Sequence, residues 1–135
     1  MKHYLLGLIT LISVQGLAQK QDKQIDDKSL AAGREIYLMN CQSCHMEQGE
    51  GLEGVYPPLA KSDYLMADKT RAIQQILKGV SGPITVNGLE YNAEMQGFSF
   101  SDQELADLLN YIRNSFGNKG GATTIDEVRK ARSKP

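Results

Sequence analysis

Tryptophan is absent from this chain of 135 residues, which also has only 2 cysteines and 2 histidines. An excess of charge of one sign is missing as well, because 15 basic residues are matched by 16 acidic ones. The composition therefore gives no indication of a nucleic-acid partner or of an anionic membrane surface. A chain of this length is expected to form one domain with a modest core.

Long hydrophobic runs are also lacking. The longest apolar stretch, YLLGLITLISVQGLA, is interrupted by Ser13 and Gln15 and falls short of the ~20 residues that a membrane-spanning helix needs. Gly16 and Ala18 are small residues at the positions that signal peptidase prefers. We therefore predict that residues 1–18 are a signal peptide, and that the protein is exported or periplasmic without an integral membrane span in the mature form. The alternative is an uncleaved membrane anchor.

Cleavage after Ala18 would change the inventory of chemical groups. Loss of Lys2 leaves 14 basic residues against 16 acidic ones. Loss of His3 leaves His45 as the only histidine of the mature chain.

The rest of the chain divides into three segments by composition. Residues 19–28 are polar and unpatterned, as expected of a flexible leader. Residues 29–117 contain the helical patterns and form the predicted domain. Residues 118–135 are Gly-rich and then basic, and we expect a disordered polar tail with at most one turn of helix at residues 124–129.

Three helices are predicted within the domain. The first begins after Ser29 as N-cap, the second begins at about Lys69 with Asp68 as N-cap, and the third begins at a capping box of Ser101 and Glu104. We expect Gly117 to close the third helix.

Two glycines carry further predictions. Gly33 lies inside the first helix, where it costs about 1 kcal/mol relative to alanine, so we expect it to permit the close approach of another helix. Gly88 follows Asn87, and this pair suits a type I′ turn in a small β-hairpin.

The motif Cys41-Gln42-Ser43-Cys44-His45 contains both cysteines and the remaining histidine. A thioredoxin-like redox pair would need a βαβ scaffold, a structural zinc site would need four ligands, and a structural disulfide would close only a very small loop. The fourth interpretation is covalent attachment of one haem, with thioethers from Cys41 and Cys44 and with His45 as an axial iron ligand. This spacing in an exported helical chain favours haem.

The second axial ligand has to be sought among the methionines. Met46 neighbours His45 and cannot reach the opposite face of a haem, while Met39 and Met66 fit helix packing better. Met95 lies in an irregular stretch between the hairpin and the last helix, which suits an axial ligand. The alternative is a buried side chain that fills a gap in the core.

At residues 28–117 the chain resembles the class I cytochrome c family, in its compact bacterial monohaem form. The resemblance is carried by the Gly33 helix, CQSCH, a Gly-rich loop, PPLA, a middle helix, a methionine loop and a long closing helix. It implies an all-α cytochrome c fold, in which three main helices and long loops surround one covalently bound haem c. It also implies that the Pro57 carbonyl accepts a hydrogen bond from the proximal His45 ring, and that Leu59 contacts the haem. The sequence departs from the family pattern at Met46, where Gly is frequent, and at Gln96, where Pro is frequent.

The resemblance and the motif together indicate a single-electron carrier rather than an enzyme, either free and monomeric or as an electron-transfer subunit of an oxidoreductase complex. Its partners would be a redox donor and a redox acceptor protein. The alternative is a haem domain with a labile sixth ligand, acting as a peroxidase-like enzyme or gas sensor. Several glutamates flank the predicted haem ligands and suggest an acidic docking surface, although they also suit a solvated loop: Glu47, Glu50, Glu53, Glu90 and Glu94.

Overall fold

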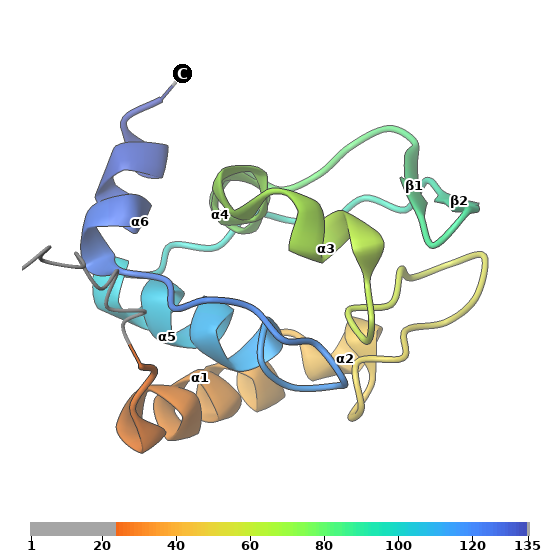
Figure 1. Cartoon of the computed structure of the whole chain (residues 1–135). Coiled ribbons are helices and arrows are strands. Elements are labelled where there is room, and N and C mark those ends of the chain that lie inside the picture. The colour runs from red at the N-terminus through yellow and green to blue at the C-terminus, as the bar shows by residue number, and fades with distance from the viewer. Residues whose placement is uncertain (1–23, 135) are drawn as a thin grey trace, which may run out of the picture.

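The computed structural model describes residues 24–134, so the predicted signal peptide lies outside the described residues. The described chain is mostly helical and has one small two-stranded sheet, as predicted. None of its helices between residues 24 and 134 has the length and apolar character needed to cross a bilayer. Figure 1 shows the arrangement, in which the elements follow in this order: α1 (Asp27–Asn40), α2 (Gln42–His45), α3 (Asp63–Ala67), α4 (Lys69–Lys78), β1 (Ile84–Val86), β2 (Leu89–Tyr91), α5 (Asp102–Ile112) and α6 (Ile125–Arg132).

Helices α1 and α5 form the central packing contact, and Gly33 makes it possible. A Cβ atom at Gly33 would lie 2.1 Å from the backbone oxygen of Asp107 and 2.7 Å from Cβ of Tyr111. The predicted close approach is therefore confirmed. One turn further along α1, the fully buried Tyr37 packs its ring 5.7 Å from that of Tyr111 and 5.1 Å from that of Phe116.

The start of α1 differs from the prediction. Asp26, not Ser29, is the N-cap, and its side chain accepts a hydrogen bond from the Ser29 backbone N–H at 2.6 Å. The Ser29 hydroxyl instead donates to Asp107 Oδ1 at 2.5 Å and accepts from Asn110 Nδ2 at 2.9 Å. The serine was misassigned because its partners lie on α5, where no local pattern reveals them.

The middle of the chain follows the predicted pattern. Asp68 caps α4 by accepting from the Arg71 N–H at 3.0 Å, and Gly79 ends the helix with a φ of 85°. The hairpin turns at Asn87 and Gly88, with φ values of 50° and 83°. Asp63, the first residue of α3, fixes the hairpin tip, because it exchanges two hydrogen bonds with Asn87, at 2.8 and 3.0 Å.

Helix α5 has the predicted start but ends earlier. Ser101 and Glu104 form the capping box. The helix ends at Ile112, and the chain continues through a non-helical turn in which Phe116 and Gly117 both adopt positive φ, at 58° and 82°. The expectation that Gly117 closes the helix is wrong, because the residues before Gly117 already form this turn.

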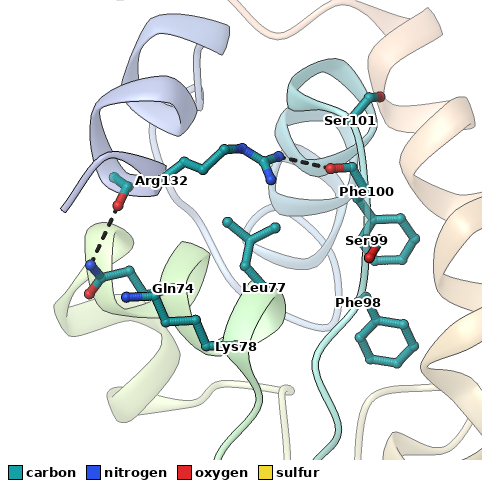
Figure 2. A pocket seen from close by; sticks show the side chains of 9 residues that line it. Gln74, Leu77, Lys78, Phe98, Ser99, Phe100, Ser101 and Arg132 are labelled. Carbon is teal, nitrogen blue, oxygen red and sulfur yellow. Dashed lines mark hydrogen bonds between the residues drawn. The ribbon is translucent and has the colours of Figure 1, made fainter. Parts of the chain in front are cut away.

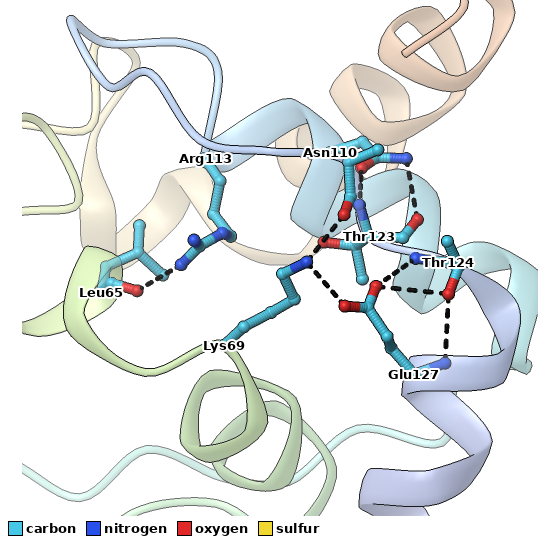
Figure 3. A network of polar contacts seen from close by, with 8 residues as sticks. Leu65, Lys69, Asn110, Arg113, Thr123, Thr124 and Glu127 are labelled. Atoms are coloured by element: carbon cyan, nitrogen blue, oxygen red, sulfur yellow. Dashed lines mark hydrogen bonds and ion pairs between the residues drawn. The ribbon is translucent and has the colours of Figure 1, made fainter. Parts of the chain in front are cut away.

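The expectation of a disordered tail after residue 117 is also wrong. Thr124 and Glu127 form a second capping box, and α6 buries Val128, which has no exposed surface, together with Ala131. Lys69 of α4 secures the start of α6, donating to the Ala122 carbonyl at 2.7 Å and to Glu127 at 2.9 Å (Figure 3). The segment therefore belongs to the folded core.

The other end of α6 packs against α4 and the irregular segment that precedes α5. Arg132 donates to the Phe100 carbonyl at 2.8 Å, and Gln74 reaches the Ala131 carbonyl at 3.4 Å (Figure 2). A shallow pocket of about 340 Å³ lies between these elements. Its charged and amide groups already form hydrogen bonds with protein atoms, so we interpret it as a gap in the packing between helices.

Candidate haem-binding site

The two cysteines and the histidine of the motif lie on one tight turn. Cys41 ends α1 and begins α2, and its carbonyl accepts from the N–H groups of Cys44 at 3.2 Å and His45 at 2.9 Å. Both thiols are free and partly buried. The pKa of the Cys41 thiol is raised to about 12, mainly by burial and to a smaller extent by the charge of the neighbouring Cys44. This sulfur is therefore protonated at neutral pH.

The His45 ring is held by one backbone carbonyl. Its Nδ1 lies 2.9 Å from the oxygen of Pro57. A carbonyl can only accept, so Nδ1 carries the hydrogen and Nε2 keeps its lone pair. Burial lowers the pKa of His45, although the bond to Pro57 acts in the opposite direction. The imidazole is therefore neutral and presents Nε2 as a metal-binding atom.

The loop after the motif returns to place Pro57 beneath that ring. The Gly49 carbonyl accepts from the N–H groups of Leu59 at 2.7 Å and Ala60 at 2.8 Å, and the Gly51 N–H donates to the His45 carbonyl at 3.0 Å. Glycine is required at Gly51, since its φ is 64° and a Cβ there would lie 2.4 Å from the Tyr56 oxygen. Leu59 is partly buried against the core.

Met95 comes from a separate segment between β2 and α5. Its N–H and carbonyl pair with Val80 at 3.0 and 2.9 Å. Glycines on both sides allow the two backbones to touch, because a Cβ at Gly79 would lie 2.4 Å from the Met95 oxygen and one at Gly97 would lie 2.5 Å from the Leu77 oxygen. The methionine loop is thus fixed to the end of α4, and the Met95 side chain is partly buried.

The other methionines agree only in part with the interpretation given to them, because Met66 packs against the core as expected whereas Met39 does not pack. Met39 is 74% exposed on α1, and Met66 is partly buried against the hydrophobic core. The structure joins Cys41, Cys44, His45, Pro57 and Leu59 through the contacts above. Between residues 24 and 134, no hydrogen bond links Met95 to this group, so its role as axial ligand stays a prediction.

The donor set fits a covalently attached haem. Two free thiols and an imidazole with its Nε2 lone pair available lie on one turn. Leu52 and Val55, in the loop after the motif, are large apolar side chains that the protein leaves 48% and 42% exposed. No group of three or more His, Cys, Asp or Glu suited to a metal ion occurs among residues 24–134. Thiols and imidazole are the groups that attach and ligate haem in c-type proteins.

Comparison with known proteins agrees with this chemistry. Residues 30–116 match the cytochrome c family, and the chain belongs to that family. Among curated proteins it is 37% identical over 114 residues to cytochrome c-552 of Thermus thermophilus, covering 77% of this chain and 86% of that protein. It is also 34% identical over 107 residues to the cytochrome c subunit of a quinone-dependent alcohol dehydrogenase of Gluconobacter oxydans. That match covers 76% of this chain but only 22% of the subunit.

A third relative is the cytochrome c subunit of a gluconate 2-dehydrogenase from Pantoea cypripedii, 33% identical over 105 residues and matched over 24% of its length. These relatives are named as a cytochrome c or as cytochrome c subunits of dehydrogenases. The chain is accordingly an electron-transfer protein of the cytochrome c family rather than an enzyme.

Sequence reasoning missed two residues next to the motif loop. Phe116 packs so closely on Gly49 that a Cβ there would lie 2.7 Å from its ring, and Asn118 donates to the Leu59 carbonyl at 2.8 Å. The pair Gly117-Asn118 carries an ordinary turn signal in the sequence. Nothing in that signal indicates a contact with residues 59 positions earlier.

Proposed function

We propose that this protein is an exported cytochrome c that carries single electrons with one haem c per chain, ligated by His45 and Met95. The observation that carries the proposal is the hydrogen bond from His45 Nδ1 to the Pro57 carbonyl, on the same turn as Cys41 and Cys44. This bond fixes the ring and the tautomer that an iron ligand needs, and it raises the basicity of Nε2.

The haem supplies the one-electron chemistry, and the protein supplies attachment and two fixed ligands. Cys41 and Cys44 would attach the haem through their sulfurs, and His45 would ligate its iron. Met95 would supply a second iron ligand, from a segment anchored by Val80 and by the close approaches at Gly79 and Gly97. Two protein ligands on fixed backbone would leave the bound iron without a free position for a substrate. The paired Met95 backbone favours the carrier over a haem domain with a labile sixth ligand, even though Gln96 stands where proline is frequent.

The predicted partners are redox proteins that dock on an acidic surface. The five glutamates near the predicted ligands are all exposed, and none of them forms an ion pair within residues 24–134. Figure 1 places α6, whose Arg129 and Arg132 are ion-paired with Asp102, at the opposite end of the molecule from the hairpin that carries Glu90. The unpaired glutamates favour an encounter in which their surface meets a basic surface of the partner. Electron-transfer rates to a basic partner are expected to fall as salt increases, and rates independent of salt would remove this part of the proposal.

The test of the ligands is an optical spectrum of the mature protein, made in a host that attaches haem. We expect a c-type spectrum with the weak near-infrared band of a methionine–iron bond in the oxidised form, and loss of that band in Met95→Ala. Met66→Ala is the matched control and is expected to keep the band. A band that survives Met95→Ala would refute Met95 as ligand. Rapid, tight binding of carbon monoxide by the reduced parent protein would favour the open-site alternative.

Export is tested separately. Mass spectrometry of the protein from a periplasmic fraction is expected to show a chain that begins at Gln19. A chain retaining residues 1–18 in the membrane fraction would instead support the anchor.

A further inference from the structure

The turn that follows α5, residues 113–118, contacts both sides of the loop that supports His45. Two successive positive φ values, at Phe116 and Gly117, reverse the chain after the helix. This reversal places the Phe116 ring on Gly49 and turns the next residue, Asn118, toward Leu59. Gly49 and Leu59 are themselves hydrogen-bonded to each other, so the turn touches the two ends of the loop where they meet.

Asn118 makes the polar part of this contact from a buried position. It is 6% exposed, and its Nδ2 donates to the Leu59 carbonyl and to the Ile112 carbonyl, each at 2.8 Å. Its backbone N–H donates to the Ser115 carbonyl at 2.9 Å. One side-chain amide thus ties the last turn of α5 to the chain two residues beyond Pro57. Both carbonyls would lose a partner if the amide were removed.

Both polar backbone groups of Leu59 are held by hydrogen bonds. Its N–H donates to Gly49 at 2.7 Å, and its carbonyl accepts from Asn118. Pro57 itself has no N–H with which to fix its own position. The orientation of the Pro57 carbonyl, and with it that of the His45 ring, therefore depends on how firmly the following residues are held.

We infer that Asn118 is a positioning residue for the proximal histidine, acting through Leu59 and Pro57. This inference rests on the proposed role of His45 as an iron ligand. Loss of the Asn118 amide loosens the Leu59 segment and weakens the bond from His45 Nδ1 to Pro57. A weaker bond makes the imidazole less basic, which stabilises ferrous relative to ferric iron and raises the reduction potential.

The test compares Asn118→Ala with Asn114→Ala in the haem-loaded protein. Asn114 is a matched control because it lies in the same turn and its amide donates to the Asn110 carbonyl at 2.9 Å and accepts from the Gly120 N–H at 3.1 Å, with no bond to the haem loop. The measurements are hydrogen exchange of the His45 Nδ1–H, followed by NMR, the reduction potential and the thermal midpoint. Loss of the hydrogen bond to Leu59 is expected to speed exchange about tenfold in Asn118→Ala, with a higher potential, while Asn114→Ala stays near the parent in both.

Each outcome decides one of two questions. If the parent protein carries no covalent haem, or if its His45 ring does not bind the iron, the proposed function fails and the inference falls with it. If the parent behaves as proposed but Asn118→Ala and Asn114→Ala show the same exchange and the same potential, the inference alone is overturned. If Asn118→Ala fails to accumulate, Asn118→Ser is measured in its place. The serine keeps a polar group in the buried position but is too short to reach Leu59 as the amide does.

Discussion

Replacement of Gly33 by alanine offers a sharp test of the packing between α1 and α5. Helix propensity alone predicts that Gly33→Ala stabilises the protein by about 1 kcal/mol. The structure predicts the opposite sign. The new methyl group would lie 2.1 Å from the Asp107 oxygen, 2.7 Å from the Asp107 carbonyl carbon and 2.7 Å from Cβ of Tyr111. None of these atoms can move by a side-chain rotation.

The size of the effect follows from the overlap. A carbon and a carbonyl oxygen rest about 3.3 Å apart or more, so the helices would have to separate by about 1 Å. Such a separation disturbs the packing of Tyr37, Leu105 and Leu108, which are at most 1% exposed. Overpacking of this kind costs about 1–3 kcal/mol or more, and with backbone atoms on the receiving side we expect the upper end. The net expectation is a destabilisation of about 2 kcal/mol.

Urea denaturation of the haem-loaded protein measures this change. An unchanged slope of the free energy of unfolding against urea concentration would show that only stability has shifted. Ala32→Gly is the matched control at the exposed neighbouring position, where only the propensity loss of about 1 kcal/mol is expected. A Gly33→Ala variant that is as stable as the parent, or more stable, would refute the close approach of α1 and α5.

Three further predictions test the parts of the fold around the site. Val128→Ala removes two buried methyl groups and is expected to lower the free energy of unfolding by about 2 kcal/mol. The exposed control Lys130→Ala is expected to change it little, and equal effects of the two variants would mean that α6 is not part of the core. Burial alone would raise the pKa of Glu127, but hydrogen bonds from the Thr124 backbone and from Lys69 together outweigh it and lower the pKa. The stabilising effect of this carboxylate is therefore present above its ordinary pKa of about 4.5 and is lost as the pH falls through the lower folded value. Glu127→Gln should flatten that part of a pH-stability profile, and an unchanged profile would contradict the assignment. Gly88→Ala places a Cβ in open space at a φ of 83°. Denaturation should therefore show only the backbone cost of about 1 kcal/mol in the free energy of unfolding. No loss of stability at all would mean that the hairpin turn relaxes.

The sequence predicts those features whose cause is local. The capping box at Ser101, the N-cap at Asp68 and the turn at Asn87-Gly88 each depend on residues within one turn of the chain, and the structure confirms all of them. Gly33 is a partial exception, since its partner is remote. Its position inside a helix nevertheless indicates that something must lie close, because glycine has a cost there.

The features that the sequence did not predict depend on distant partners. Ser29 suits an N-cap by type, yet its hydroxyl bonds to Asp107, 78 positions away. Helix α6 has few apolar residues, and Val128 shows its role only once α4 and α5 are in place. The capping box of Thr124 and Glu127 was a usable signal for this helix. The basic residues that follow outweighed it and favoured a tail.

The candidate site divides along the same line. Its chemistry is local, because both thiols and the imidazole lie within five consecutive residues, and the helical hydrogen bonds of one turn set their arrangement. The control of that chemistry is remote. Pro57 orients the ring from 12 positions away, and Asn118 holds Leu59 from 59 positions away. A motif of this kind can therefore identify the cofactor of a chain, whereas the tuning of its iron ligand is decided by packing between segments that no short pattern connects.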